Sequence, residues 1–319
     1  MNDLIPIFYA CDDIFAQYAI VSVRSLVENA DKSRKYRIHI LNTGISGAHR
    51  DELLKMQNEQ FSICFPDVTA FLESVQDRLP IRDYYTKTTY YRLFIPEMYP
   101  EYDKAVYIDS DTIVLGNVAE LFDHDLKDNY VAACHEQAMV QEDVYGTYVE
   151  QVLGIDRNAF FNAGMIVLNC RELRSNHLLA GFTDLLGKYN FVVTQDEDYL
   201  NLLCKDKVLW LHPGWNTEVF GVLPCPEDEI KIIHYIMVSK PWHYSDCRLQ
   251  EHFWHYADMT DVAAGIREEL AAYTDEQRAE DAASCRRLMQ TAKEETARED
   301  NYFNRLRRKE FGPDAYSSI

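Results

Sequence analysis

Residues 107–115 have the sequence Tyr-Ile-Asp-Ser-Asp-Thr-Ile-Val-Leu, which places two carboxylates directly after a short apolar segment. We expect a strand over residues 104–108, with the side chains of Asp109 and Asp111 pointing the same way at its end. A turn at this point brings both carboxylates into the crevice in which open α/β sheets bind ligands. Two hard oxygen donors at this spacing suit Mg²⁺ or Mn²⁺ better than zinc. The stretch therefore predicts a metal site at the end of a sheet strand.

The same Asp-x-Asp spacing occurs elsewhere in this acidic chain, at residues 123–125 and 196–198. The first of these pairs lies in a polar turn, and we interpret it as solvated. Asp109 and Asp111 differ because apolar residues flank them on both sides. Burying two unpaired carboxylates is costly unless a cation or hydrogen-bond donors meet them. The flanking residues therefore favour a metal site over a solvated loop.

The composition excludes some classes of function. The chain has 319 residues, 47% of them hydrophobic, which is enough for one large α/β domain or two modest ones. Its formal net charge is −20. A nucleic-acid partner is not expected, because neutralising phosphates needs a basic surface. The same acidity means that a site for an anionic ligand needs a metal as counter-charge.

Targeting signals are not expected in this sequence. Its first residues show no basic segment followed by a long apolar one, so we expect no signal peptide. No run of about 20 apolar residues occurs, so we expect no transmembrane segment. The eight scattered cysteines form no Cys-x-x-Cys pair and are typical of reduced thiols in a cytoplasmic protein. We therefore expect a cytoplasmic location.

Strands and helices alternate from the start of the chain. Strands are expected at residues 4–10, 36–41 and 61–65, with helices at 15–29 and 46–58 between them. This order predicts the α/β class, with a mostly parallel central sheet flanked by helices. Further strands are expected at 130–134, 165–168, 208–211 and 232–235, and further helices at 88–95, 178–188 and 196–204.

The composition changes near residue 260. Residues 266–308 contain neither Pro nor Gly and are rich in Ala, Glu and Arg, which predicts helices. We therefore expect one domain over residues 1–260 and a helical C-terminal appendix over 261–319. In one interpretation the appendix is a helix pair packed on the main domain. In the other, it makes a weak peripheral contact with anionic lipid through its aromatic and basic side chains, Tyr302, Phe303, Leu306, Arg307, Arg308, Lys309 and Phe311.

Several motifs follow one another in a specific order along the chain. They are Ala10-Cys11-Asp12-Asp13 with Phe15, Thr88-Thr89-Tyr90-Tyr91-Arg92-Leu93, the Asp109/Asp111 pair, Phe161-Asn162-Ala163-Gly164, Gln195-Asp196-Glu197-Asp198-Tyr199-Leu200-Asn201, and His234 followed by Lys240-Pro241-Trp242-His243. Together they resemble the bacterial galactosyl- and glucosyltransferases of glycosyltransferase family 8, over about residues 7–254. The resemblance implies the GT-A nucleotide-diphospho-sugar transferase fold. It also implies a retaining, metal-dependent transfer of glucose or galactose from a UDP-sugar to a sugar hydroxyl of a glycan or glycolipid.

The resemblance gives each of these positions a role. The end of the first strand resembles a uridine-binding loop, in which Phe15 stacks on the uracil. Arg92 matches an arginine that approaches the donor sugar and the pyrophosphate. Residues 195–201 fall on the segment beneath the anomeric carbon. The implied donor-binding residues are Ala10, Asp12, Asp13, Phe15, Arg92, Ser110, Asn162, Asp196 and Lys240; the implied metal ligands are Asp109, Asp111 and His234; the implied catalytic residues are Asp196 and Glu197.

The leaving group explains why such a site needs cations. UDP departs with negative charge next to the breaking bond, so a cation must bridge its phosphates. Mn²⁺ or Mg²⁺ held by Asp109, Asp111 and His234 would act as a Lewis acid. Lys240 would add a second positive charge at the diphosphate. Asn162 and Asp196 would orient the sugar through its hydroxyl groups.

Three residues depart from the family pattern. Ile14 stands where the loop often has Asn, which removes one contact to the nucleotide. Met237 stands where the family has Gly, three residues after the histidine, and narrows the approach to the phosphates. Glu197 stands where Gln is common. Its carboxylate is either a covalent nucleophile or electrostatic stabiliser beneath the anomeric carbon, or a residue that only contacts a sugar hydroxyl or an ion partner.

Two other functions remain as alternatives. The Asp109-Ser110-Asp111-Thr112 segment also resembles haloacid-dehalogenase phosphatases, whose first aspartate attacks phosphorus. In those enzymes, however, the motif follows the first strand, whereas here three strands precede it. The other alternative is a non-catalytic module that binds a UDP-sugar or a glycan. The sequence identifies neither the acceptor nor the choice between glucose and galactose.

Overall fold

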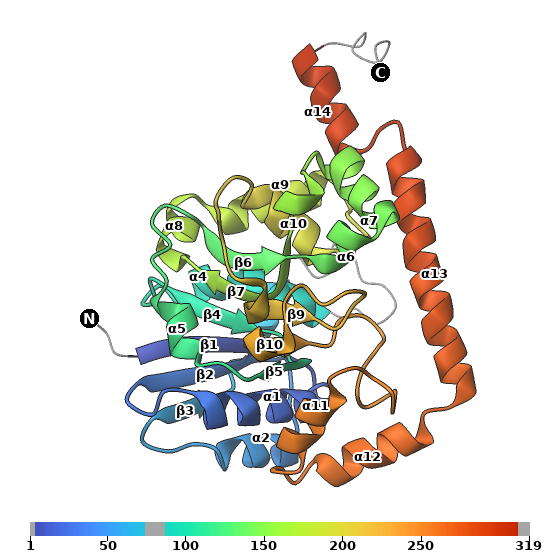
Figure 1. The fold of residues 1–319 in the computed structure, drawn as a ribbon. Coiled ribbons are helices and arrows are strands. Elements are labelled where there is room, and N and C mark those ends of the chain that lie inside the picture. The colour runs from blue at the N-terminus through green and yellow to red at the C-terminus, as the bar shows by residue number, and fades with distance from the viewer. Residues whose placement is uncertain (1–3, 74–86, 312–319) are drawn as a thin grey trace.

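Seven strands form the central sheet of the computed structural model, which describes residues 4–73 and 87–311 (Figure 1). Within this sheet β7 runs antiparallel to both of its neighbours, and the other adjacent pairs are parallel. The mostly parallel sheet confirms the predicted α/β class. Across the sheet the strands are β3 (Phe61–Cys64), β2 (Lys35–Leu41), β1 (Leu4–Ala10), β4 (Ala105–Ile108), β7 (Phe161–Leu168), β6 (Val131–His135) and β8 (Val208–Trp210).

Strand β1 is apolar throughout because both of its faces are buried. Ile5, Ile7 and Tyr9 point into the core on one side of the sheet, and Phe8 and Ala10 point into the core on the other. A strand covered on both faces needs a continuous apolar run rather than an alternating one. This requirement explains why the sequence at the start of the chain predicted a strand.

Helices cover the two faces of the sheet. Helices α1 (Ala16–Asn29) and α2 (Gly47–Leu54) pack on the face that carries Ile7. Helices α9 (Leu178–Lys188) and α10 (Asp196–Leu203) pack on the opposite face (Figure 1). The helix predicted over residues 46–58 ends earlier than expected. Its continuation is replaced by a turn, because the Asn58 side chain accepts hydrogen bonds from the backbone of residues 60 and 61.

The strand order reverses between β1 and β4. After β1 the chain moves outward to β2 and β3, and it then returns to lie on the other side of β1 as β4. Open α/β sheets bind ligands in the crevice at the carboxyl ends of the strands at such a switch point. Ala10 ends β1 here, and Asp109 follows β4. The Ser110 hydroxyl donates to the Ala10 carbonyl at 3.2 Å and joins the two strand ends.

A second, three-stranded sheet brings a distant segment to the same place. It consists of β5 (Thr112–Val114), β10 (Ile232–His234) and β9 (Thr217–Glu218), with β10 in the centre. In the antiparallel β5/β10 pair, His234 lies opposite Thr112. The predicted imidazole ligand is thereby placed beside the Asp-x-Asp turn. Helix α11 (Gln250–Ala257) and α1 share a hydrophobic cluster with this sheet.

The C-terminal part is helical, as predicted. It consists of α12 (Ala263–Ala272), α13 (Asp275–Ala297) and α14 (Tyr302–Phe311). Helix α13 begins with a capping box between Thr274 and Gln277 and runs along the side of the molecule next to α7 (Asp143–Tyr148) (Figure 1). A domain boundary near residue 260 stays a prediction. The start of the first predicted domain, residues 1–3, and the end of the second, residues 312–319, lie outside the described residues.

The remaining elements are short. The predicted helix at 88–95 is a 3₁₀ helix, η1 (Lys87–Phe94), followed by α4 (Ile95–Met98). Across residues 4–73 and 87–311, none of the helices is both long and apolar enough to cross a bilayer. All eight cysteines are free thiols. The other elements are α3 (Thr69–Glu73), α5 (Val118–Asp123), α6 (Gln137–Gln141), η2 (Val149–Leu153), η3 (Arg157–Ala159), α8 (Cys170–Ser175), η4 (Pro213–Asn216) and η5 (Glu227–Glu229).

Candidate active site

A cleft of about 1150 Å³, counted to its open mouth, lies at the carboxyl ends of β1 and β4. Asp12 and Asp13 are not among its described lining residues, although they lie close by in the chain. Most of the residues predicted from sequence do line it, namely Ala10, Phe15, Arg92, Asp109, Ser110, Asp111, Asn162, Asp196, Glu197, His234 and Lys240.

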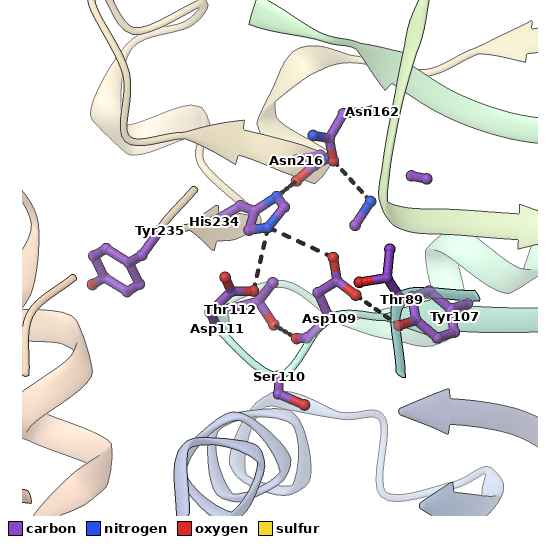
Figure 2. A network of polar contacts seen from close by, with 12 residues as sticks. Thr89, Tyr107, Asp109, Ser110, Asp111, Thr112, Asn162, Asn216, His234 and Tyr235 are labelled. Atoms are coloured by element: carbon purple, nitrogen blue, oxygen red, sulfur yellow. Dashed lines mark hydrogen bonds and ion pairs between the residues drawn. The ribbon is translucent and has the colours of Figure 1, made fainter. Parts of the chain in front are cut away.

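The two aspartates lie in the turn between β4 and β5, and His234 faces them from β10 (Figure 2). The His234 Nε2 atom is 3.9 Å from Asp109 Oδ2 and 3.3 Å from Asp111 Oδ1. One donor atom from each of the three residues lies within 4.8 Å of the others. Two carboxylate oxygens and one imidazole nitrogen at this separation form a donor set that suits Mn²⁺ or Mg²⁺.

Gly164 makes room for this donor set. A Cβ atom at residue 164 would lie 2.1 Å from His234 Cε1 and 2.9 Å from Asp109 Oδ2. Any other residue would push the imidazole and the carboxylate apart. The close approach explains the glycine of the Phe-Asn-Ala-Gly motif, and it supports the fit of this cluster to a metal ion.

The tautomer of His234 follows from its hydrogen-bond partners. Asn162 Oδ1 accepts from the Gly164 backbone N–H at 2.8 Å, so the Asn216 amide at 2.7 Å must donate to it through Nδ2. Asn216 Oδ1 must then accept from His234 Nδ1 at 3.0 Å (Figure 2). The Nε2 lone pair is therefore left facing the two carboxylates. An outer partner of this kind orients an imidazole for metal binding.

Lys240 contacts one of the three potential metal ligands, Asp111. Its Nζ atom is 2.6 Å from Asp111 Oδ2 and also donates to the Tyr235 carbonyl. Burial acts to raise the pKa of Asp111, but the charge of the adjacent Lys240, the largest opposing cause, holds that pKa below its usual range. Asp111 is therefore ionised at neutral pH, as a metal ligand must be.

Arg92 connects Asp109 to Asp196 within the cleft. Its Nη2 atom is 3.1 Å from Asp109 Oδ1, and its Nε atom is 3.0 Å from Asp196 Oδ2. The guanidinium also lies over the Tyr107 ring, 4.4 Å from its centre. Burial raises the pKa of Asp196 to about 7, and Arg92 limits the rise. Asp196 therefore exchanges its proton near neutral pH.

Glu197 is buried next to the Phe-Asn-Ala-Gly motif. Its Oε1 atom accepts from the Ala163 N–H at 2.8 Å. Burial, followed by the charges of Glu136 and Asp196, raises the pKa of Glu197 well above its usual range. Glu136 in turn accepts from the Asn162 amide at 2.5 Å. Neither Glu136 nor Asn216 was predicted from the sequence, because neither belongs to a local motif.

The predicted uridine-binding loop is held by its two aspartates. Asp12 Oδ1 accepts from the Phe15 N–H at 2.9 Å, just before α1 begins. Asp13 Oδ1 accepts from Ser46 N and from His49 Nδ1, each at 2.8 Å. Both carboxylates are therefore engaged in shaping the loop that presents Phe15 to the cleft. Their contact with a nucleotide stays a prediction.

Two departures from the family pattern are visible in the structure. Ile14 is 72% exposed at the mouth of this loop. Met237 lines the cleft and has a φ of +54°, in the left-handed region that glycine adopts without strain. The backbone thus keeps the conformation expected of glycine, and the methionine side chain takes up space in the lining of the cleft.

This fold, with a metal-type cluster and buried polar groups at its switch point, defines a glycosyltransferase of the GT-A class. The sequence model described as glycosyl transferase family 8 matches residues 6–246, and the chain belongs to this family. A putative glycosyltransferase of Haemophilus influenzae is 27% identical over 256 residues, covering 78% of this chain and 72% of the relative. A lipopolysaccharide 1,2-glucosyltransferase of Escherichia coli is 24% identical, with 74% and 72% covered.

Solved structures agree with the fold. Two crystal structures of LgtC superpose with TM-scores of 0.68 and 0.65, at 25% and 24% identity. Each comparison covers 81% of this chain and 96% of the other. One is described as an active-site mutant, and the other as a galactosyltransferase in complex with donor and acceptor sugar analogues. The likeness confirms the predicted GT-A fold.

Proposed function

We propose that this glycosyltransferase is a retaining enzyme that moves glucose or galactose from a UDP-sugar to a sugar hydroxyl of a glycan or glycolipid. The observation that carries the proposal is the Asp109, Asp111 and His234 cluster. It lies in one cleft with Arg92 and Glu197, at the switch point of the sheet. Family membership excludes the phosphatase alternative.

The transfer exchanges one bond at the anomeric carbon for another. The bond to the β-phosphate oxygen breaks, and its electron pair leaves with UDP. The acceptor hydroxyl oxygen forms the new bond, and its proton passes to the leaving diphosphate. Because the reacting carbon gains positive charge on the way, nearby carboxylates favour the transition state over the ground state.

The residues of the cleft divide this work. Asp109, Asp111 and His234 would hold Mn²⁺ or Mg²⁺, which would supply Lewis-acid stabilisation of the leaving diphosphate. Lys240 would interact with the phosphates instead of with Asp111, because a bound metal would neutralise that carboxylate. Glu197 would hold a sugar hydroxyl beneath the anomeric carbon. The rest of the predicted donor site, Ala10, Asp12, Asp13, Phe15, Arg92, Ser110, Asn162 and Asp196, would bind the uridine and orient the sugar.

A panel of UDP-hexoses tests this proposal. UDP-glucose or UDP-galactose should raise the melting temperature in the presence of Mn²⁺, and EDTA should abolish the shift. The bound sugar should then be released slowly by water as free hexose. Asp111→Ala should fold but lose metal-supported UDP binding, and undiminished UDP–Mn²⁺ affinity in this variant would refute the metal site. Binding without release of hexose or transfer would favour the non-catalytic module instead.

We propose that the enzyme is cytoplasmic and makes a weak peripheral contact with anionic lipid through α14. A surface hollow at the ends of α9 and α14 supports the contact, because four of its five lining residues are cations in a protein of net charge −20. Anionic lipid headgroups attract such clusters. The lining residues are Lys188, Tyr189, Arg305, Arg308 and Lys309.

A further inference from the structure

Part of the cleft lining has no role in binding the donor as proposed above. Once the metal ligands, the cations and the residues around the donor sugar are assigned, an apolar group of side chains is left. Apart from Ile236 and Met237, which follow β10, its large members come from four parts of the chain: α6, α7, the segment before α10, and α13. These four side chains, which we call the apolar wall, are Met139, Tyr145, Val193 and Leu288.

Leu288 is the unexpected member of the apolar wall. It lies on α13, well beyond residue 246, where the match to the family ends. Its side chain is 6% exposed, and Ala292, one turn further along, is fully buried in the same hydrophobic core. Helix α13 also packs against α7, which carries Tyr145. The helix is therefore seated on the cleft by its own apolar face.

Hydrogen bonds fix the segment that leads into α13. Asp281 accepts from the hydroxyl groups of Tyr244 and Tyr273, at 2.8 and 2.7 Å. On α12, Glu269 accepts from the Tyr18 hydroxyl at 2.6 Å, and His243 lies 3.3 Å from it. These contacts join both helices to α1 and to the segment that follows Lys240. The C-terminal helices thus have a defined position relative to the cleft.

We propose that the apolar wall is the binding surface for the acceptor sugar, and that α13 thereby helps to determine which acceptor is used. The inference rests on the glycosyltransferase function proposed above. An acceptor of matching chemistry is a hexopyranoside that lays the C–H face of its ring on the wall. Such a face is apolar, whereas its hydroxyl groups need polar partners, and Glu136 and Thr194 lie in the same lining.

The position of the wall favours the acceptor over the donor. Apolar side chains make no favourable contact with a diphosphate, which the cations and the metal site are proposed to bind. Val193 and Thr194 come just before Gln195 in the chain, and they line the same cleft as Asp196 and Glu197, which are expected beneath the anomeric carbon. A sugar on the wall would therefore lie next to the reacting carbon, where the attacking hydroxyl must be.

Leu288→Ala tests the proposal, with Met289→Ala as its matched control. Met289 is the next residue of α13 and packs on the same core, but it does not line the cleft. Acceptor KM is measured with UDP-glucose and UDP-galactose on methyl and p-nitrophenyl glycosides of glucose and galactose. Leu288→Ala should raise acceptor KM roughly ten-fold, since each buried methylene changes affinity about four-fold. UDP affinity and hydrolysis of the donor by water should change less than about two-fold. Met289→Ala should leave all three unchanged.

A second variant covers the case in which Leu288→Ala does not fold. Leu288→Phe fills the site and should raise KM for the same glycosides by narrowing the wall. An unchanged KM in either folded Leu288 variant, or an equal rise in Met289→Ala, would overturn the proposal. It is also overturned if the wild-type enzyme hydrolyses a UDP-hexose but neither glycosylates nor binds any glycoside of the panel. Failure of the proposed function itself is different, because the wild type would then neither bind UDP with Mn²⁺ nor release hexose.

Discussion

Replacing Asn216 by Ala should weaken metal binding, although Asn216 touches no metal. The change removes the acceptor for the His234 Nδ1–H at 3.0 Å and the donor to Asn162 Oδ1 at 2.7 Å. The imidazole would then be free to rotate or to adopt the other tautomer. Its Nε2 lone pair would face the Asp109 and Asp111 carboxylates for only part of the time.

The size of the effect can be worked out from these two contacts. Loss of an outer partner of a metal-bound histidine typically lowers metal affinity 10- to 100-fold, or about 1.4 to 2.8 kcal/mol. Because His234 is buried, its Nδ1–H is left unpaired, at a cost of about 1 to 3 kcal/mol to folding, whereas Asn162 Oδ1 keeps the hydrogen bond from the Gly164 N–H. Asn216→Ala should therefore lose both metal affinity and stability. Asn216→Asp, which keeps an acceptor for His234, should recover most of the affinity.

Calorimetric titration of Mn²⁺ into the UDP-saturated protein measures the effect. Asn169→Ala is a suitable control, since Asn169 is also buried and makes hydrogen bonds to the backbone at Lys127, Asn129 and Glu172. This control should lose stability but keep its Mn²⁺ affinity. Unchanged Mn²⁺ affinity in Asn216→Ala, or an equal loss in Asn169→Ala, would refute the argument.

Four further outcomes are expected. Lys240→Ala should lower the affinity for UDP about ten-fold but leave the affinity for uridine nearly unchanged, because the ammonium interacts with phosphate. Equal losses of affinity in a competition assay would place Lys240 away from the phosphates. Glu197→Gln should keep activity within about ten-fold and UDP binding intact, whereas a glycosyl adduct on Glu197, seen by intact mass with donor alone, would identify a nucleophile. The raised pKa of Asp196 favours the folded state at low pH, and this stability is lost as pH rises from 3.8 to about 7. In this pH range the free energy of unfolding of the donor-free protein should therefore decrease by up to about 1.4 kcal/mol per pH unit relative to that of Asp196→Asn. The same pH dependence in both proteins would contradict the shift. Arg308→Glu should reduce sedimentation with anionic vesicles, with Arg171→Glu as the exposed control, and equal binding by both would argue against α14 as the contact.

The fold was largely predictable because its dominant signals are local. The apolar run of residues 4–10 and the helical spacing of 15–29 both arise from burial of a parallel strand and its crossover helix. The direction of β7 was not predictable, since an apolar strand carries no mark of its orientation. In the small sheet only β10 was predicted, as the strand at residues 232–235, and β5, β9 and the pairing of the three were missed for a related reason. These strands are two or three residues long, and they pair segments far apart in the chain.

In the candidate site, too, local motifs could be predicted, and contacts between distant segments could not. Its motif residues, such as Asp109, Asp111 and His234, carry chemistry that the sequence displays at fixed spacing. Asn216 carries none, because an asparagine between two short elements is typical of any loop. It becomes informative only when β9 and β10 bring it against the imidazole. The position of Leu288 in the cleft lining could not be predicted either, because it lies in a helix whose charged composition is typical of a surface helix.

Glu197 shows how burial can offset a departure from the family pattern. An ionised glutamate could not replace a glutamine here, because it would bring a bare charge next to Glu136 and Asp196. Burial and those two neighbours raise its pKa well above the usual range, which favours the neutral acid in the donor-free enzyme. A neutral carboxyl group has one oxygen that accepts and one hydroxyl that donates, like the two ends of an amide. One oxygen already accepts from the Ala163 N–H, which leaves the hydroxyl to meet a sugar oxygen. The carboxyl becomes a nucleophile only after it loses this proton, and for this reason the Glu197→Gln exchange is expected to be mild.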